Sequence, residues 1–411
     1  AAPAPSAPAL VTPPVVGDRR VFAVCASLDC SKFQKVVARA QSVGAHVAIY
    51  VDSLAPVSLT PATLDTLKQV FDTLLYPTDT TAFGGVTDLD NNGVVIALMT
   101  PVVNALVTKS ACTTTGYIAG FFFPDDLILS IPIDSSNHGE IFYSIVPDPA
   151  GTFSCVHTVG AVDTVVPGTF VHELQHLINF AQHILIKFGN TPEEGWLDEG
   201  LSKYAEELAG RKYLQAADTG KFSIFAINDV YDAYQYLSAT GNSPLLIQYD
   251  QGTLAEVGAS WLFMRYLVDQ FGAPVTGKLD QTTLVGSANV AAQTGQPFTT
   301  SVTRWALANW VSDLPGFATP AELSYPSWRF RTRTFASLNQ QDPRNFPLPY
   351  PLVPTQSGSG SVSLSGTLRS GSGVYQRVLQ DPGAPAFTLY FSGPSATFSS
   401  AVPRLNIIRI R

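Results

Sequence analysis

Hydrophobic and polar residues follow regular patterns over most of the chain, and these patterns predict a mixed α and β fold. In the first third, short apolar runs bounded by turn residues predict strands, whereas apolar residues repeated every three or four positions predict helices. The expected strands are Arg20–Cys25, Ala45–Asp52, Val94–Met99 and Ile141–Ile145, and the expected helices are Phe33–Val43 and Thr60–Leu75. From Phe222 to about Leu338 the pattern is mostly helical, as in Ala255–Phe271 and Thr303–Val311.

One further helix has clear start and stop signals. Pro167-Gly168 predicts a loop that ends just before Thr169, whose hydroxyl can cap the helix that follows. Lys187 falls in the expected last turn, and Gly189 can adopt the left-handed conformation that ends many helices. The apolar face consists of Phe170, Leu174, Leu177, Ile178, Ala181, Leu185 and Phe188.

Two of the chain's 6 histidines lie on this helix, four residues apart. At that spacing His172 and His176 project from nearly the same side, so both imidazoles can bind one zinc ion. Glu173 is turned by about 100° and lies beside the metal, where its carboxylate can take a proton from water and later give it to a leaving amine. His-Glu-x-x-His on a helix therefore predicts a catalytic zinc site of the zincin class.

A catalytic zinc site needs a third protein ligand and keeps its fourth position open. Helical spacing continues at Leu197, Leu201, Ala205 and Leu208, which places Glu199 near the start of a second helix. This helix can pack back against the first, so we expect Glu199 to be the third ligand. Asp198 and Glu194 are rival candidates.

The segments His172–Phe180 and Trp196–Ser202 resemble the gluzincin metallopeptidases, and most of all the bacterial hyicolysin-type peptidases. The resemblance extends over roughly residues 18 to 340. It implies that both histidines of the motif and Glu199 bind Zn²⁺ and that Glu173 is the general base.

The resemblance also directs attention to residues around the metal. Lys203 stands where thermolysin-like enzymes carry a carboxylate that steadies a histidine ligand, so Asn179 and Glu206 become candidates for that role. Zincins often use a Tyr or His to hold the oxyanion of the reaction, and Tyr249 is our choice for it. The alternatives are Tyr231, Tyr234 and Tyr236.

Composition indicates the compartment and excludes some partners. A net charge of −8 argues against nucleic acid, and no apolar run approaches the roughly 20 residues of a membrane span. The low charged fraction of 14% is a compositional feature common in secreted proteins. For the four cysteines we favour the disulfides Cys25–Cys30 and Cys112–Cys155, with a cysteine-based metal site as the alternative.

Composition also divides the chain. Residues 1–17 are a Pro/Ala-rich linker, and the absence of an initial Met suggests a mature form whose signal peptide has been removed. Residues 18–340 are expected to form an α+β, zincin-like peptidase domain. In residues 341–411, alternation in Gly360–Leu368 and Ala386–Phe391 predicts a small all-β sandwich or jelly-roll domain.

Asp88, Asp90 and Asn92 precede Gly93 in the pattern of the first half of a calcium loop. Met99 stands where an EF-hand would place its glutamate ligand. Two interpretations stay open, a turn that leads into a buried strand and a site for Ca²⁺.

Together these features predict a secreted, monomeric zinc endopeptidase that acts on protein or peptide substrates. A zinc aminopeptidase is the first alternative, although Gly116–Gly120 lacks the carboxylates that would hold a free substrate amine. The second alternative is a catalytically silent adhesion or binding protein on a zincin scaffold.

Overall fold

A computed structural model describes residues 12–247, 252–358, 368–369, 371–385 and 404–410. Its residue contacts divide the chain into two compact units. The first unit is Ala1–Glu193, Ser202–Ile227 and Thr276–Val285, and the second is Glu194–Leu201, Asn228–Val275 and Gly286–Arg411. Among the described helices, none is both long and apolar enough to cross a membrane.

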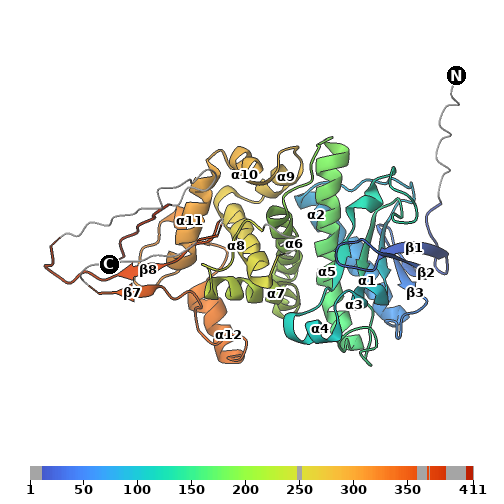
Figure 1. Cartoon of the computed structure of the whole chain (residues 1–411), viewed down its shortest axis with the longest axis horizontal. Coiled ribbons are helices and arrows are strands. Elements are labelled where there is room, and N and C mark those ends of the chain that lie inside the picture. Colours follow the sequence, from blue (N-terminus) through green and yellow to red (C-terminus); the bar gives the residue numbers. More distant parts are fainter. Residues whose placement is uncertain (1–11, 248–251, 359–367, 370, 386–403, 411) are drawn as a thin grey trace, which may run out of the picture. The chain divides into compact units, whose positions relative to one another are not determined.

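A six-stranded sheet with the order β1-β2-β3-β4-β6-β5 is the framework of the first unit (Figure 1). β1, β2 and β3 are antiparallel neighbours, β3, β4 and β6 run parallel, and β5 is antiparallel to β6. All four strands predicted for the first third of the chain are present. The strands are β1 (Arg19–Cys25), β2 (Phe33–Val43), β3 (Val47–Asp52), β4 (Val95–Met99), β5 (Gly120–Phe122) and β6 (Ile141–Ser144).

The prediction of a helix at Phe33–Val43 is wrong, because this segment is strand β2. Its buried residues Val36, Ala38, Ala40 and Ser42 alternate with more exposed ones, which is the period of a strand. Alanine favours helices in isolation, but β2 pairs with β1 on one side and β3 on the other. The two ladders of backbone hydrogen bonds override the local preference.

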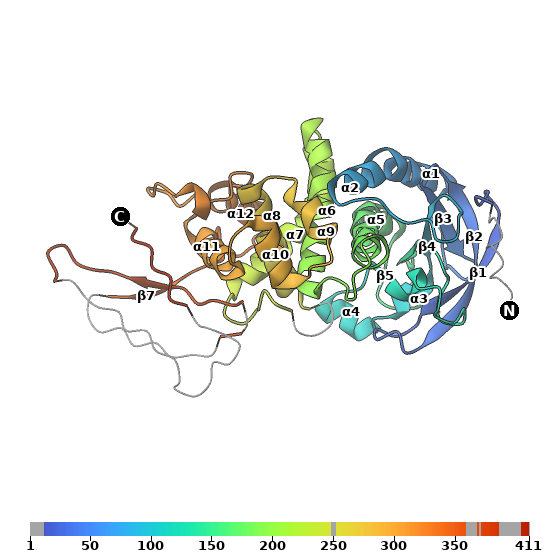
Figure 2. The same cartoon turned by 90° about the horizontal axis from the view of Figure 1, so that it is seen from above.

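Helices pack on this sheet. α1 (Pro61–Val70) begins at the cap Thr60 and continues through a π-helical turn, Phe71–Leu75, into α2 (Tyr76–Ala82). The helix expected at Thr60–Leu75 is therefore present and runs further than predicted. Figure 2 shows α5 (Val159–Phe180) on the inner side of the curved sheet, with α1 and α2 next to it. Shorter elements are α3 (Pro101–Ala105), α4 (Lys109–Thr115) and the 3₁₀ turn Pro124–Leu127.

Three fully buried phenylalanines fix α5 to the sheet. The ring of Phe170 on α5 lies 5.0 Å from that of Phe142 on β6 and 6.4 Å from that of Phe71, measured between centroids. All three side chains are 0% exposed. Aromatic rings bury more apolar area than other side chains, so this cluster holds the histidine-bearing helix firmly.

The prediction that the helix starts at Thr169 is wrong, because α5 starts ten residues earlier at Val159, capped by Thr158. Pro167 lies inside the helix, and the Thr169 hydroxyl donates to the carbonyl of Val165. A proline in a helix interior costs about 3 kcal/mol. Val162, Val166 and Phe170 form one buried stripe against the sheet, and their burial offsets that cost.

The C-terminal end of this helix lies where the sequence predicts it. α5 passes into a π-helical segment, Ala181–Ile186, that closes at Lys187. The left-handed residue is Phe188, with φ +59°, rather than Gly189. Gly189 is required for another reason, because a Cβ there would lie 2.6 Å from the carbonyl oxygen of His183.

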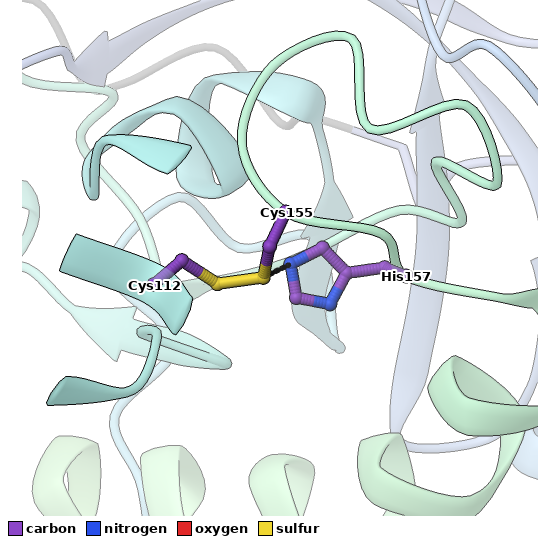
Figure 3. Close-up of side chains that lie close together, drawn as sticks. All are labelled: Cys112, Cys155 and His157. Atoms are coloured by element: carbon purple, nitrogen blue, oxygen red, sulfur yellow. Dashed lines mark hydrogen bonds between the residues drawn. A yellow bond between two sulfur atoms is a disulfide. The ribbon is translucent and has the colours of Figure 1, made fainter. Parts of the chain in front are cut away.

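Both predicted disulfides are confirmed. Cys25–Cys30 links the last residue of β1 to the turn that leads into β2. Cys112–Cys155 joins α4 to the loop before α5 (Figure 3). His157 lies beside the second bridge, with Nε2 3.6 Å from Cys155 Sγ. Because the sulfurs are bonded to each other, the cysteine-based metal site is not formed.

The second unit is mainly helical, as predicted. Trp261 and Phe263 on its longest helix, together with Trp305, are fully buried and form its core. Its helices are α8 (Leu254–Phe271), α10 (Gly286–Thr294), α11 (Phe298–Val311) and α12 (Phe335–Gln341), with short turns at Ala321–Leu323 and Phe330–Thr334. Three helices belong partly to each unit, namely α6 (Gly195–Gln215), α7 (Thr219–Ser238) and α9 (Val275–Asp280).

Near the C-terminal end, the described residues contain one parallel pair of short strands, β7 (Thr355–Ser357) and β8 (Gln376–Val378). The strand expected at Gly360–Leu368 lies, except for its last residue, outside the described residues. The strand expected at Ala386–Phe391 lies entirely outside them. The sandwich or jelly-roll domain therefore stays a prediction.

Candidate active site

The two histidines of the His-Glu-x-x-His motif converge on one point. His172 and His176 lie one turn apart on α5, and their Nε2 atoms are 3.1 Å from each other. Imidazole nitrogens bind zinc at about 2.0–2.1 Å, so two ligands of a tetrahedral ion lie about 3.3 Å apart. The two nitrogens therefore have the separation that a shared zinc ion requires.

A carboxylate from α6 completes a set of three possible metal ligands. His172, His176 and Glu199 each offer a ligand atom, and these atoms all lie within 4.8 Å of one another. The rivals Glu194 and Asp198 are not part of this cluster. Glu194 instead accepts a hydrogen bond from the indole of Trp196 at 2.6 Å. Two imidazoles and one carboxylate are a donor set found in catalytic zinc sites.

The first histidine is steadied by Glu206, one of the two residues proposed for that role. His172 Nδ1 lies 2.9 Å from Glu206 Oε1, and the same oxygen lies 3.0 Å from Lys203 Nζ. Burial alone would raise the pKa of Glu206, but the Lys203 ammonium and the hydrogen bond to His172 outweigh it and lower the pKa. A charged acceptor on Nδ1 keeps the ring proton there, so that Nε2 of His172 carries the lone pair that binds metal.

The second histidine has a partner that the sequence reasoning missed. His176 Nδ1 lies 3.0 Å from the hydroxyl of Ser202 on α6. Asn179, the other proposed residue, donates instead to Asp280 at 2.6 Å. Ser202 and Glu206 follow Glu199 by three and seven residues, so all three occupy one face of α6. That helical spacing is a signal from which Ser202 could have been found.

Glu173 on α5 lies close to strand β5. It is only 5% exposed, and a Cβ built on Gly120 would lie 3.2 Å from its Oε1. Gly120 starts β5, which is one of the two edge strands of the sheet, whereas β6 is an inner strand paired with both β4 and β5. The strand predicted at Ile141–Ile145 is thus an inner strand, and β5 is the edge strand beside Glu173. Adjacency of strands cannot be read from the sequence.

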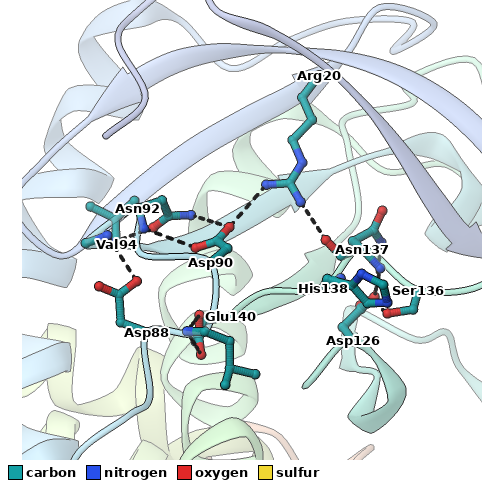
Figure 4. A network of polar contacts seen from close by, with 12 residues as sticks. Arg20, Asp88, Asp90, Asn92, Val94, Asp126, Ser136, Asn137, His138 and Glu140 are labelled. Carbon is teal, nitrogen blue, oxygen red and sulfur yellow. Dashed lines mark hydrogen bonds and ion pairs between the residues drawn. The ribbon is translucent and has the colours of Figure 1, made fainter. Parts of the chain in front are cut away.

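A second group of carboxylates in the first unit lies around the Asp88–Gly93 turn (Figure 4). Asp88, Asp90 and Glu140 bring ligand atoms within 4.8 Å of one another. Asn92 lies beside them, with its Nδ2 donating to Asp90 Oδ2 at 2.9 Å and its side-chain oxygen accepting from the amide of Val94 at 2.7 Å. Backbone amides bonded to these side chains define the predicted Asx turn.

Arg20 supplies positive charge to this group. Its guanidinium lies 3.6 Å from Asp90 in an ion pair that Figure 4 shows. Glu140 is buried and accepts hydrogen bonds from the Thr87 hydroxyl at 2.6 Å and the Leu89 amide at 3.0 Å. Burial raises the pKa of both Asp90 and Glu140. The contacts found here are those of a structural turn.

The proposed oxyanion-binding residue, Tyr249, lies outside the described residues. Two of its alternatives are packed in the second unit. The Tyr236 ring stacks on Trp305 at a centroid distance of 5.6 Å, and the Tyr234 hydroxyl accepts from the backbone amide of Leu348. Tyr231 packs edge-on against Phe346.

Fold and site thus define a mixed α/β protein with a histidine and carboxylate cluster typical of metallopeptidases. Among curated proteins, the chain is similar to the neutral metalloprotease ShpI of Staphylococcus hyicus, with 27% identity over 207 residues. The match covers 50% of this chain and 41% of that protein, so the chain spans about two fifths of the relative's length. No protein-family model matches the chain. The similarity supports a metalloprotease family.

Proposed function

We propose that the protein is a secreted, monomeric, zinc-dependent endopeptidase. The observation that carries this proposal is the convergence of His172, His176 and Glu199 within 4.8 Å, with Glu173 on the same helix as both histidines. The similarity to a neutral metalloprotease supports the same chemistry. The two disulfides are compatible with an oxidising, extracellular compartment.

In this proposal the chain's own residues bind the metal and move the proton. Zinc held by the two histidines and Glu199 would supply the Lewis acidity that polarises the scissile carbonyl and acidifies a water molecule. The Glu173 carboxylate takes a proton from that water as the oxygen of the water bonds to the carbonyl carbon. Glu173 then gives the proton to the amide nitrogen as the carbon–nitrogen bond breaks.

The edge position of β5 favours cleavage of internal peptide bonds of a substrate rather than removal of its terminal residue. An unpaired edge can align an extended peptide by backbone hydrogen bonds, and Gly120 on β5 brings that edge close to Glu173. Within Gly116–Gly120 no carboxylate is available to hold a free substrate amine. Both features favour an endopeptidase over an aminopeptidase.

Hydrolysis of an internally quenched peptide with a blocked N-terminus tests this proposal. The wild-type chain should cleave it, and Glu173→Gln should lower kcat by at least about 100-fold because it removes the proton carrier. Bound zinc should be equal in the two proteins. Cleavage that requires a free N-terminus would indicate an aminopeptidase. Near-full activity of Glu173→Gln would refute the assigned role, and a wild-type chain that binds no zinc would favour the catalytically silent alternative.

A further inference from the structure

A directed series of hydrogen bonds leads from His176 into the interior of the first unit. His176 Nδ1 lies 3.0 Å from Ser202 Oγ, and this hydroxyl donates to Gln175 Oε1 at 2.5 Å. Gln175 Nε2 donates in turn to the carboxylate of Asp280, at 3.3 and 3.4 Å from its two oxygens. The series joins α5, α6 and the end of α9.

The direction of each bond follows from the last residue of the series. The Asp280 carboxylate only accepts hydrogen bonds, so the amide nitrogen of Gln175 must face it and the amide oxygen must face Ser202. That oxygen only accepts as well, so it takes the single hydrogen of the Ser202 hydroxyl. Ser202 Oγ is then left as an acceptor for His176, and Nδ1 of His176 must carry the ring proton.

This tautomer is the one that metal binding needs. With the proton on Nδ1, the lone pair of His176 is on Nε2, which lies 3.1 Å from the Nε2 of His172. Gln175, Ser202 and Asp280 are each 0% exposed. Since water cannot compete at these atoms, the series fixes both the tautomer and the rotation of the ring.

We propose that Ser202, Gln175 and Asp280 are positioning residues that hold His176 ready to bind zinc. The inference rests on the proposed function and adds to it, because the two histidines are held by different means. His172 is held by a charged partner, Glu206, and His176 through two neutral side chains that end on a buried carboxylate. Residues of this kind commonly change metal affinity 10- to 100-fold when they are removed.

Asn179 provides a matched control. It donates to the same carboxylate of Asp280 at 2.6 Å and is also buried, but it is not part of the series that reaches His176. Gln175→Met and Asn179→Leu each replace an amide by an apolar group of similar size. Both remove a hydrogen bond to Asp280, so both should lower thermal stability. Only Gln175→Met removes the acceptor that orients Ser202.

Zinc affinity of the full chain, measured by competition with a chromophoric chelator, tests the inference. We expect Ser202→Ala and Gln175→Met to weaken zinc binding about tenfold or more, while Ser202→Thr, which keeps the hydroxyl, and Asn179→Leu stay within about threefold of wild type. Circular dichroism checks that each variant is folded. Wild-type affinity in both Ser202→Ala and Gln175→Met would overturn the inference, as would an equal loss in Asn179→Leu. If the wild-type chain itself binds no zinc, the proposed function fails first, so the two failures are distinguishable.

Discussion

At the residue scale, the molecule contains a buried carboxylate that costs stability. Asp79 on α2 is 0% exposed, and neither of its carboxylate oxygens has a hydrogen-bond partner among the described residues. Burial and, after it, repulsion from Asp280 raise the pKa of Asp79 well above its usual value. The folded state therefore holds a proton that the unfolded chain releases at about pH 4.

This shift predicts how stability depends on pH. Because the native state binds more protons than the unfolded state above about pH 4, Asp79 makes folding less favourable as pH rises from there. Asp79→Asn removes the ionisable group, and with it the cost of keeping the group protonated at pH 7, so it should raise the free energy of unfolding at pH 7 by at least about 1 kcal/mol. Chemical denaturation at pH 4 and pH 7 measures both effects. A variant that is no more stable than wild type at pH 7 would show that the buried Asp79 does not lower the stability of the protein.

At the element scale, the sequence predicts most of the framework and its chemistry. The His-Glu-x-x-His motif, the strands β1, β3, β4 and β6 and both disulfides follow from local patterns. The wrong predictions arise where contacts between residues far apart in the sequence determine the local structure. β2 is a strand because it has neighbours on both sides. Pro167 is helical because Val162, Val166 and Phe170 on the same helix are buried. The Ser202 hydroxyl was missed as the acceptor for His176, although its spacing from Glu199 places both residues on one face of α6.

Strand β5 is the element whose position matters most for the proposed reaction. A Cβ on Gly120 would lie 2.6 Å from the carbonyl oxygen of Tyr143 on β6 and 2.5 Å from Cγ2 of Thr169 on α5. Contacts this short force a backbone to move. Gly120 therefore allows the edge strand to lie close to both the sheet and the helix that carries Glu173.

Substitution of this glycine tests the role of the edge. Gly120→Ala should displace β5, cost about 1–3 kcal/mol of stability and lower kcat/KM for the blocked peptide while bound zinc stays constant. Gly160→Ala is the control, since a Cβ at Gly160 on α5 meets nothing within 4 Å and alanine favours a helix. Unchanged kcat/KM in a folded Gly120→Ala would contradict the proposed alignment of substrate along β5.

At the scale of the whole molecule, the central claim is that this chain holds a catalytic zinc ion. The ligand cluster draws on α5 and α6, which both carry buried apolar faces, and its histidines are each fixed by a hydrogen bond at Nδ1. These features are those expected of a site organised before metal binds, with Glu173 beside it as the proposed proton carrier.

The metal content of the purified chain tests this claim most directly. Elemental analysis of protein prepared without chelators should find one zinc ion per chain. Treatment with 1,10-phenanthroline should remove it together with peptidase activity, and added zinc should restore both. His176→Ala should not retain stoichiometric zinc, because it leaves only two of the three ligands. A folded wild-type chain without stoichiometric zinc, or one that keeps its activity after the metal is removed, would contradict the account.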